Sequence, residues 1–337
     1  MSAGVLDHLE EVGQGRVTYD LTAGSDDVAS SGGCVTQANP IAHVRGAGVA
    51  QYRDGIDVPE QDPLGATGRA SLFDGHHPVQ VEDVDPEVCE ERQQTAADGR
   101  IEGHTQAGYA LALRFDLLPE ELRSRAARHM VEALDRYNGH LSTGIQTTNR
   151  LMLELTRNGY DDEAYRLLNL RTFPSWGFMI ENGATTIWER WDGYVKGRGF
   201  QNPGMNSFNH WAIGAVGEWM WRHIIGIQPD EAQPGFKHFV VWPRPGGGLT
   251  WARGAYESIR GQIASDWKIE DGTFSLAVTV PVNTSATVYV PTSDTASVQE
   301  SGKPARQAKG VRFLHEEDGN AVYSVGSGTY EFAAPAR

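Results

Sequence analysis

The hydrophobic and polar positions divide the chain into three parts of unlike texture. Residues 1–97 are rich in Gly, Asp, Gln and Pro, hold few aromatic side chains, and show no sustained period of 3.6 or 2. Such a long run without a pattern argues against a compact domain. We therefore expect residues 1–97 to form an atypical, loop-rich or disordered N-terminal segment.

From about residue 98 the pattern becomes helical. Tyr109, Leu113 and Leu117 recur at four-residue steps on one face. Pro119 precedes two glutamates, which suits the first turn of a helix and its positive dipole end. Gly226 fits the position just after a helix C-terminus. The predicted helices span 104–118, 118–137, 146–160, 161–171 and 206–226, the last being the longest.

Beyond Pro229 the pattern changes to short β-branched or aromatic runs separated by turns such as Glu270-Asp271-Gly272. Runs of this kind are typical of an antiparallel β-sandwich. The sequence thus predicts a mainly α portion over 98–228, with helix following helix and no strands between, and a β-sandwich domain over 229–337.

The segment between 172 and 206 has no good helical period and concentrates unusual side chains. We interpret it as a long loop, and long loops of this composition are usually functional. At its centre, residues 183–193 read GATTIWERWDG, which places Glu189 between two tryptophans. Aromatic faces beside a carboxylate suit a sugar, because the C–H face of the ring lies on an indole while hydroxyls and the anomeric carbon meet the carboxylate.

Two interpretations of Glu189 remain open from its neighbours alone. It is either a general base that activates water for glycosidic hydrolysis, or a carboxylate paired with Arg190 or another base on a loop. Glu181 and Asp192 are weaker catalytic candidates that fit the role of loop-ordering hydrogen-bond acceptors.

The aromatic and histidine candidates have structural alternatives too. Trp176 and Trp191 either stack on sugar or anchor the loop by burying large apolar areas. His210 is expected one turn into the last helix, where it either faces the same cavity or is a half-buried helix-start histidine bonded to a carbonyl.

Composition and charge exclude several classes of binding partner. The length of 337 residues suggests about two domains. The net charge of −15 disfavours phosphate backbones and anionic membranes, so we expect neither nucleic acid nor a membrane as partner. The N-terminus lacks a basic and an apolar region, so a cytoplasmic location is expected. With two cysteines and no His-x-x-x-His pair, we predict no disulfide framework, metal or cofactor.

Several long strings resemble, in the right order, the bacterial α-L-rhamnosidases of glycoside hydrolase family 78. Among them are PSWGFMIENGATTIWERWDGY, NPGMNSFNHWAIGAVGEWMW and PGFKHFVVWPRPGGGL. The resemblance runs from about residue 98 to about residue 290, and more loosely to the end. It implies an (α/α)6 barrel of helical hairpins followed by a β-sandwich, and inverting hydrolysis that releases L-rhamnose from glycosides.

The resemblance also assigns roles to residues. The glutamate of the I-W-E-R-W motif is the general base in that family, which here is Glu189. The histidine of M-N-S-F-N-H belongs to the sugar pocket. Trp176 and Trp191 match aromatic positions of the family. The substrate-binding residues that we expect are His210, Trp176, Trp191, Trp188 and Asp192.

One departure affects catalysis. Inversion needs a second carboxylate as acid, about 6.5–9.5 Å from the base. The family's acid stretch, of the type D-E-R-x-G-W, has no counterpart here, and we interpret Glu90-Glu91-Arg92 as a solvated charge run. Other candidate acids are Glu181, Asp192, Glu102 and Glu218.

The helical portion itself looks incomplete. Residues 98–227 supply only about five or six helices of ordinary length, roughly half of a twelve-helix barrel. Because an open barrel exposes apolar surface, a homo-oligomer that covers this face is expected. The alternatives are a non-catalytic carbohydrate-binding remnant, or an inactive fragment that needs a partner chain.

Overall fold

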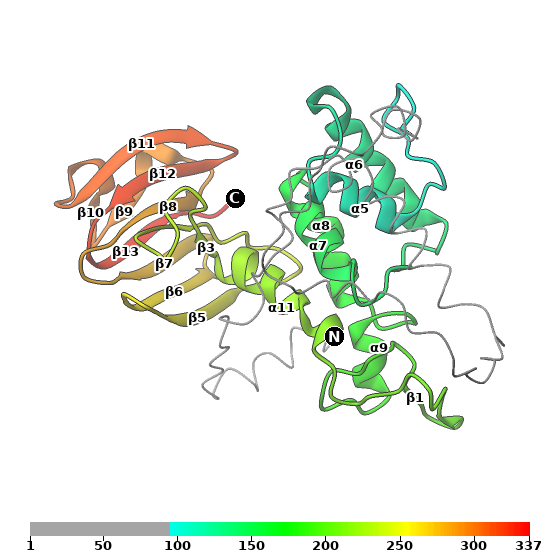
Figure 1. Ribbon diagram of the computed structural model, residues 1–337. Helices are drawn as coiled ribbons and strands as arrows, with labels where there is room; N and C mark the ends of the chain where they lie inside the picture. The colour runs from blue at the N-terminus through cyan, green and yellow to red at the C-terminus, as the bar shows by residue number, and fades with distance from the viewer. Residues whose placement is uncertain (1–94) are drawn as a thin grey trace, which may run out of the picture. The chain divides into compact units, whose positions relative to one another are not determined.

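The computed structural model describes residues 95–337 (Figure 1). The prediction for the N-terminal segment, and both cysteines, therefore fall outside the described residues. The described residues divide into two compact units, the first ending at Met130 and the second running over Val131–Arg337. Within 95–337, every helix is too short or too polar to cross a bilayer.

The first unit contains α5 (Gln106–Arg114) and the start of α6 (Glu120–Asp135). The Thr105 side chain caps α5 by accepting a hydrogen bond from the backbone N–H of Gly108. The helix is shorter than predicted, because Asp116 has a left-handed φ of 52° and the chain turns there. Leu117, expected on its apolar face, lies beyond the helix end.

The helices of the second unit begin with a hairpin. Asn158 and Gly159 join the first two helices, and the side chain of Asn158 donates to the carbonyl of Glu154 at 2.8 Å. Three acidic residues occupy the first turn of the second helix, where the helix dipole favours them. In chain order the helices are α7 (Thr148–Arg157), α8 (Asp161–Asn169), α9 (Trp176–Glu181), α10 (Trp211–Gly214), α11 (Val216–Trp219) and the π-helical η2 (Met220–Ile225).

Two predictions about these helices were wrong. The segment 172–206 is not all loop: it contains α9, which Ser175 caps by accepting from the N–H of Phe178, and the hairpin of β1 (Tyr194–Val195) and β2 (Gly199–Phe200). The predicted single helix over 206–226 is three short helices in succession, starting only at Trp211. Its predicted end is right, since Gly226 has φ 91°.

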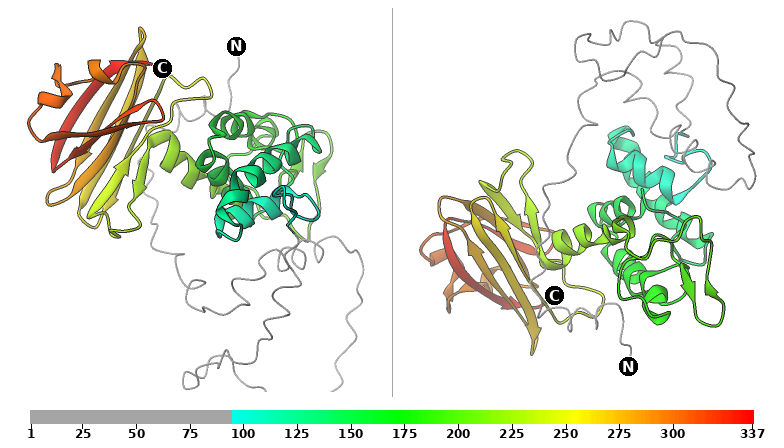
Figure 2. Two further views of the ribbon diagram at one scale, coloured as in Figure 1. Left: turned by 90° about the horizontal axis from the view of Figure 1, so that it is seen from above. Right: turned by 60° about the horizontal axis from the view of Figure 1, so that its bottom comes forward.

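The remainder of the second unit is a sandwich of two sheets, whose layers are visible in Figure 2. Their strand orders are β10-β9-β13-β7-β6-β5 and β11-β12-β8-β4-β3. All pairings are antiparallel except β4 with β8, which is parallel and was not expected. The strands are β3 (Ile227–Pro229), β4 (His238–Val241), β5 (Trp251–Ser258), β6 (Gly261–Glu270), β7 (Thr273–Val280), β8 (Ser285–Pro291), β9 (Gln299–Glu300), β10 (Lys303–Pro304), β11 (Val311–Glu317), β12 (Asn320–Val325) and β13 (Gly328–Pro335).

The sandwich core follows from alternation along the strands. In β7 every second side chain is buried, and the same pattern recurs in β8. Large side chains from both sheets fill the interior, including Phe239, Trp267, Phe274 and Tyr323. The two sheets therefore share one apolar core.

Helices and sandwich of the second unit are joined through buried polar contacts. Ser265 Oγ donates to the carbonyl of Ile225, and Trp267 Nε1 donates to that of Ile224, each at 2.7 Å. Gly226, directly after η2, leaves no room for a side chain, because a Cβ would lie 2.4 Å from the nitrogen of Pro243. The end of the last helix is thus fixed to β6.

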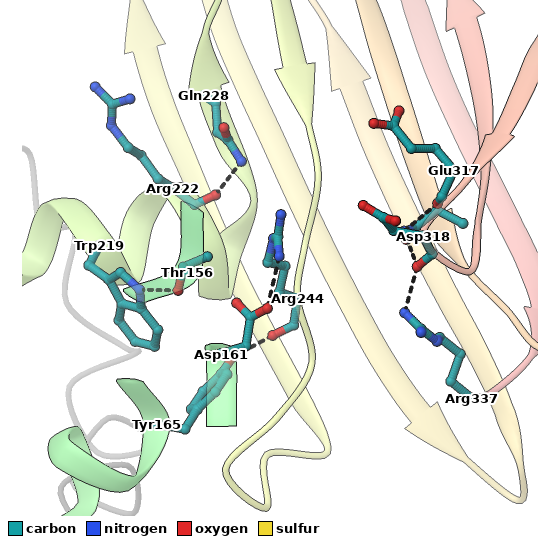
Figure 3. Close-up of polar contacts among 11 residues, drawn as sticks. Thr156, Asp161, Tyr165, Trp219, Arg222, Gln228, Arg244, Glu317, Asp318 and Arg337 are labelled. Atoms are coloured by element: carbon teal, nitrogen blue, oxygen red, sulfur yellow. Dashed lines mark hydrogen bonds and ion pairs between the residues drawn. The ribbon is translucent and has the colours of Figure 1, made fainter. Parts of the chain in front are cut away.

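A second set of contacts joins the same parts (Figure 3). Arg244 Nη1 lies 2.8 Å from Asp161 Oδ2, and the Tyr165 hydroxyl donates to the carbonyl of Arg244 at 2.6 Å. In the helical layer, Trp219 Nε1 donates to Thr156 Oγ1 at 2.8 Å. These contacts hold α8 and α11, the helices that frame the segment carrying the candidate site.

Candidate functional site

Glu189 lies in the irregular chain between α9 and β1, and a second segment fixes its position. Its backbone N–H donates to the carbonyl of Ser207 at 2.8 Å, while the N–H of Ser207 donates to Glu189 Oε2 at 2.9 Å. The side chain remains half-buried. The carboxylate is therefore oriented by a backbone donor and still reaches solvent.

The same two segments also position His210. Its backbone N–H donates to the carbonyl of Ile187 at 2.9 Å, so residues 187–189 run beside 207–210. This pairing brings the neighbourhood of Glu189 next to that of His210, although the two residues are 21 positions apart in the sequence.

His210 is the N-cap of α10, rather than a residue one turn inside it as predicted. Its Nδ1 accepts a hydrogen bond from the N–H of Ala212 at 3.3 Å. In a neutral ring this places the proton on Nε2, which can donate to a hydroxyl group. The ring also stacks on Trp211 at 6.3 Å between centroids and 10° between planes.

Trp188 anchors the backbone on one side of Glu189. Its indole is 4% exposed and meets the ring of Phe208 edge-on, with centroids 5.3 Å apart. Phe208 follows Ser207, the partner of Glu189. The aromatic contact therefore fixes the two segments that hold the carboxylate.

Trp176 and Trp191 form an edge-to-face pair, with centroids 5.1 Å apart and planes at 85°. Trp176 is 4% exposed and donates from Nε1 to the carbonyl of Ile213 at 3.2 Å. Trp191 is half-buried and donates to the carbonyl of Thr143 at 3.4 Å. Burial favours the anchoring interpretation for Trp176 and Trp188, whereas Trp191 keeps a surface that a sugar can reach.

Arg190 pairs with Asp192: its Nε lies 2.7 Å from Asp192 Oδ1. This contact matches the loop-ordering role considered for Asp192. The interpretation in which Glu189 pairs with Arg190 would have required this same guanidinium group, which here contacts Asp192.

Comparisons with known proteins bear on the family and the fold of the chain. The family model for the bacterial α-L-rhamnosidase six-hairpin glycosidase domain matches residues 90–224, and the model for the bacterial α-L-rhamnosidase C-terminal domain matches residues 226–305. Residues 90–305 belong to the bacterial α-L-rhamnosidase family. The predicted fold class, a six-hairpin-type helical portion followed by a β-sandwich, is confirmed.

Three relatives show how far the likeness extends. A protein of Streptomyces avermitilis named α-L-rhamnosidase is 45% identical over 70% of this chain, which spans 22% of it. One of Formosa agariphila with the same name is 40% identical over 68% of this chain, which spans 25% of it. The crystal structure of the S. avermitilis α-L-rhamnosidase complexed with L-rhamnose has a TM-score of 0.67 at 43% identity, over 73% of this chain and 23% of that one. The chain thus spans about a quarter of the length of the curated relatives it matches.

Among the described residues of the second unit, the candidate acids of this rhamnosidase-family chain already have partners. Glu181 Oε1 lies 2.8 Å from Arg171 Nη1. Glu218 lies 2.9 Å from Arg222 Nε and accepts from Asn149 Nδ2 at 2.8 Å. Asp192 is paired with arginine as well, as described above. Each of these three carboxylates is thus in an ion pair with an arginine. Glu102 lies in the other unit.

Two residues and one hairpin near Glu189 were not predicted from the sequence. Ser207 and Thr143 act mainly through backbone atoms, for which residue type gives no signal. The β1–β2 hairpin did have a signal: the glycines of Lys196-Gly197-Arg198-Gly199, of which Gly197 and Gly199 have φ 81° and 78°, separate two short β-type pairs.

Proposed function

We propose that this chain supplies the general base of an α-L-rhamnosidase, with Glu189 as that base, and that it acts on rhamnose-containing glycosides by inverting hydrolysis. The observation that supports this most is the backbone donation from Ser207 to Glu189 Oε2, which orients a solvent-reaching carboxylate among aromatic rings. The names of the relatives, and the L-rhamnose bound in one of their crystal structures, support the substrate class.

In this mechanism the carboxylate of Glu189 accepts a proton from a water molecule. The water oxygen forms a bond to the anomeric carbon as the bond from that carbon to the leaving oxygen breaks, and the new bond lies on the opposite face of the sugar. The leaving oxygen takes a proton from the general acid. Placing the base so that it removes the water proton in the transition state contributes about 10²–10⁴-fold to the rate.

The surrounding residues have separate roles in the proposal. Trp191 gives its accessible face to the sugar ring, and Nε2 of His210 donates to a sugar hydroxyl. The buried side chains of Trp176 and Trp188 hold the surrounding backbone in position, and Asp192 orders the loop through its ion pair with Arg190.

The acid is the open part of the mechanism. Since Glu181, Asp192 and Glu218 are engaged with arginines, the candidates that are left for the acid are Glu102, residues outside those described, and a second copy of the chain in a homo-oligomer. The same pairings favour a second candidate function, a carbohydrate-binding chain that retains the rhamnose pocket without turnover.

Release of p-nitrophenol from p-nitrophenyl α-L-rhamnoside tests the proposal and separates these functions. The wild-type chain should turn over the substrate, and Glu189→Gln should lower kcat by about 10²–10⁴-fold. Glu181→Gln is the matched control, because it removes an ion-paired carboxylate from the same segment and should leave kcat within a few-fold. Calorimetric binding of L-rhamnose without turnover would favour the binding chain, and absence of both would contradict the proposal.

A further inference from the structure

Three Asn-Gly pairs lie in the second unit, each in the turn that follows a helix. They are Asn138-Gly139 after α6, Asn158-Gly159 after α7 and Asn182-Gly183 after α9. An Asn-Gly pair can modify itself, because the glycine has no Cβ to obstruct attack by its backbone nitrogen on the side-chain amide carbon of the asparagine. The proposed hydrolysis gives these pairs no role, and their surroundings differ.

The backbone nitrogen of the glycine is held alike in all three turns. Each N–H donates to a carbonyl of the preceding helix: Gly139 to Leu134 at 3.0 Å, Gly159 to Thr156 at 3.0 Å, and Gly183 to Ile180 at 2.8 Å. The attacking nitrogen therefore has to leave a similar hydrogen bond in each pair. A difference in reactivity between the pairs has to come from the asparagine.

Two of the asparagine side chains are tied to their own helices. Asn158 Nδ2 donates to the carbonyl of Glu154, and Asn182 Nδ2 donates to the carbonyl of Phe178, each at 2.8 Å. Asn182 Oδ1 also accepts from the N–H of Lys196 at 2.8 Å. Both asparagines are half-buried. A hydrogen bond must break before either amide can rotate to meet the glycine nitrogen.

Asn138 differs from the other two asparagines in both respects. Its side chain is exposed. Within residues 95–337, the structure shows no hydrogen bond of its side-chain amide. Rotation of the Asn138 amide toward the nitrogen of Gly139 therefore breaks no hydrogen bond of that side chain.

The backbone carbonyl of Asn138 has a partner that can assist the reaction. His140 Nδ1 lies 2.9 Å from this oxygen and 3.2 Å from the carbonyl oxygen of Tyr137. Because a carbonyl oxygen only accepts, Nδ1 carries the proton, and Nε2 of the neutral ring accepts from Thr172 Oγ1 at 2.7 Å. When the nitrogen of Gly139 gives up its proton, negative charge spreads onto the Asn138 carbonyl oxygen, where the N–H of His140 stabilises it.

We propose that Asn138 is a site of self-modification in the folded chain, and that His140 assists the reaction. The nitrogen of Gly139 forms a bond to Cγ of Asn138, the bond from Cγ to Nδ2 breaks, and the proton of the Gly139 nitrogen leaves with Nδ2 as ammonia. Water then adds to one carbonyl carbon of the five-membered imide and breaks the bond from that carbon to the nitrogen. Opening at Cγ gives aspartate, and opening at the backbone carbonyl carbon gives isoaspartate.

Either product changes the segment between α6 and α7. The conversion adds one negative charge to a chain whose net charge is −15, and isoaspartate lengthens the backbone by one methylene. The same segment contains Thr143, whose carbonyl accepts from Trp191 Nε1. The modification thus alters the support of a candidate-site residue, and its chemistry does not depend on the hydrolysis proposed for that site.

Incubation of the full chain at pH 8, followed by proteolysis and mass spectrometry, measures the conversion at all three pairs in one sample. Asn138 should convert about tenfold faster than Asn158 and Asn182, as expected when one ordinary hydrogen bond must break first at the other two. Chromatography of the peptides that contain residue 138 should show both aspartate and isoaspartate.

The same incubation in urea is the control for local sequence. The unfolded chain has none of these hydrogen bonds, so the three pairs should convert at similar rates. In the folded chain, His140→Ala should slow the conversion at Asn138 about fivefold, because the N–H on its carbonyl is lost. The rates at Asn158 and Asn182 and the circular dichroism spectrum should be unchanged in this variant.

Three results would overturn the inference. Equal rates at the three pairs in the folded chain, or a faster rate at Asn158 or Asn182, would remove the assignment of Asn138. A preference for Asn138 that persists in urea would show that local sequence, and not the fold, selects it. An unchanged or faster rate in His140→Ala would contradict the assistance by His140.

Discussion

Glu189 and Ser207 hold each other through two backbone-based contacts: Glu189 N–H to the Ser207 carbonyl at 2.8 Å, and Ser207 N–H to Glu189 Oε2 at 2.9 Å. Because the second contact reaches a carboxylate oxygen, it fixes the side chain as well as the loop. The position of the proposed base thus depends on a residue 18 positions away.

Shortening the Glu189 side chain should show how far its role depends on the position of the carboxylate rather than on its charge. Glu189→Asp keeps the carboxylate but withdraws it by one methylene from the N–H of Ser207 and from the attacking water. We expect kcat to fall by about 10²-fold with little change in the affinity for L-rhamnose, because misplacing a base raises the transition-state barrier more than it affects the bound ground state. Steady-state kinetics and calorimetry on the same preparation measure both; a loss of rhamnose affinity as large as the loss of kcat would contradict a role in catalysis.

Trp176 should prove important for stability rather than for sugar contact. Trp176→Phe removes the donor to the buried Ile213 carbonyl and part of a packed indole, which should lower the free energy of unfolding by about 1–3 kcal/mol. Urea denaturation measures this change. Trp191→Phe, at the half-buried partner ring, should cost less stability but weaken rhamnose binding more. The reverse order would assign the sugar contact to Trp176.

The Asp161–Arg244 pair should couple the helical layer to the sandwich of the second unit. The guanidinium of Arg244 also lies over the Trp242 ring, 4.1 Å from its centroid, and that ring stacks on Tyr289 at 4.1 Å. Asp161→Asn should therefore lower the free energy of unfolding by about 1–2 kcal/mol, and Arg244→Gln by more, because it removes the ring contact as well.

An exposed ion pair of equal length serves as the control for that prediction. Lys268 Nζ lies 2.8 Å from Glu270 Oε2 on the surface of β6. Lys268→Gln should change the unfolding midpoint little, since exposed pairs are screened by solvent. Equal effects of Lys268→Gln and Asp161→Asn in thermal denaturation would show that the pair between α8 and the sandwich is no more than a surface contact.

His223 should make stability depend on pH. Its side chain is buried, and burial, with the nearby guanidinium groups of Arg244 and Arg222, lowers its pKa from 6.5 to about 3. Between these values the unfolded chain binds a proton that the folded chain does not. The stability that the folded chain gains while His223 stays neutral is therefore fully present above pH 6.5 and is lost as the pH falls toward 3.

The measurement is urea denaturation at pH 7 and pH 5. Across this interval the wild type should lose about 2 kcal/mol more than His223→Gln, which cannot take up the proton. The difference between the two chains should vanish when each is compared at pH 7 and pH 8. An equal loss in both chains between pH 7 and pH 5 would show that other groups cause the acid sensitivity.

The helices that the sequence predicted correctly are those with clear local signals in their own residues. The helix that follows Pro119 and the two helices joined by Asn158-Gly159 were found where expected, because apolar period, charged ends and turn residues all agree there. The helix over 206–226 was not continuous, since Gly214 and Gly217 lower helix propensity and the chain changes to π-type turns at Met220. The short α9 has too few residues for a period, although Ser175 before Trp176 was a usable capping signal.

The sequence named candidate residues for the site but not their arrangement. Composition and resemblance singled out Glu189 and His210. The pairing of residues 187–189 with 207–210 depends on backbone hydrogen bonds between distant segments, which side-chain identity does not encode.

The most direct test of the central claim, that Glu189 is the base of an inverting hydrolysis, is rescue of Glu189→Ala by azide with 2,4-dinitrophenyl α-L-rhamnoside as substrate. This leaving group needs little protonation, so the outcome does not depend on where the acid lies. Azide needs no base and fits the space of the missing carboxylate. We predict that wild type releases dinitrophenol, that Glu189→Ala alone does not, and that azide restores release with β-L-rhamnosyl azide as the product seen by NMR. No rescue, or an α-configured azide, would contradict the account.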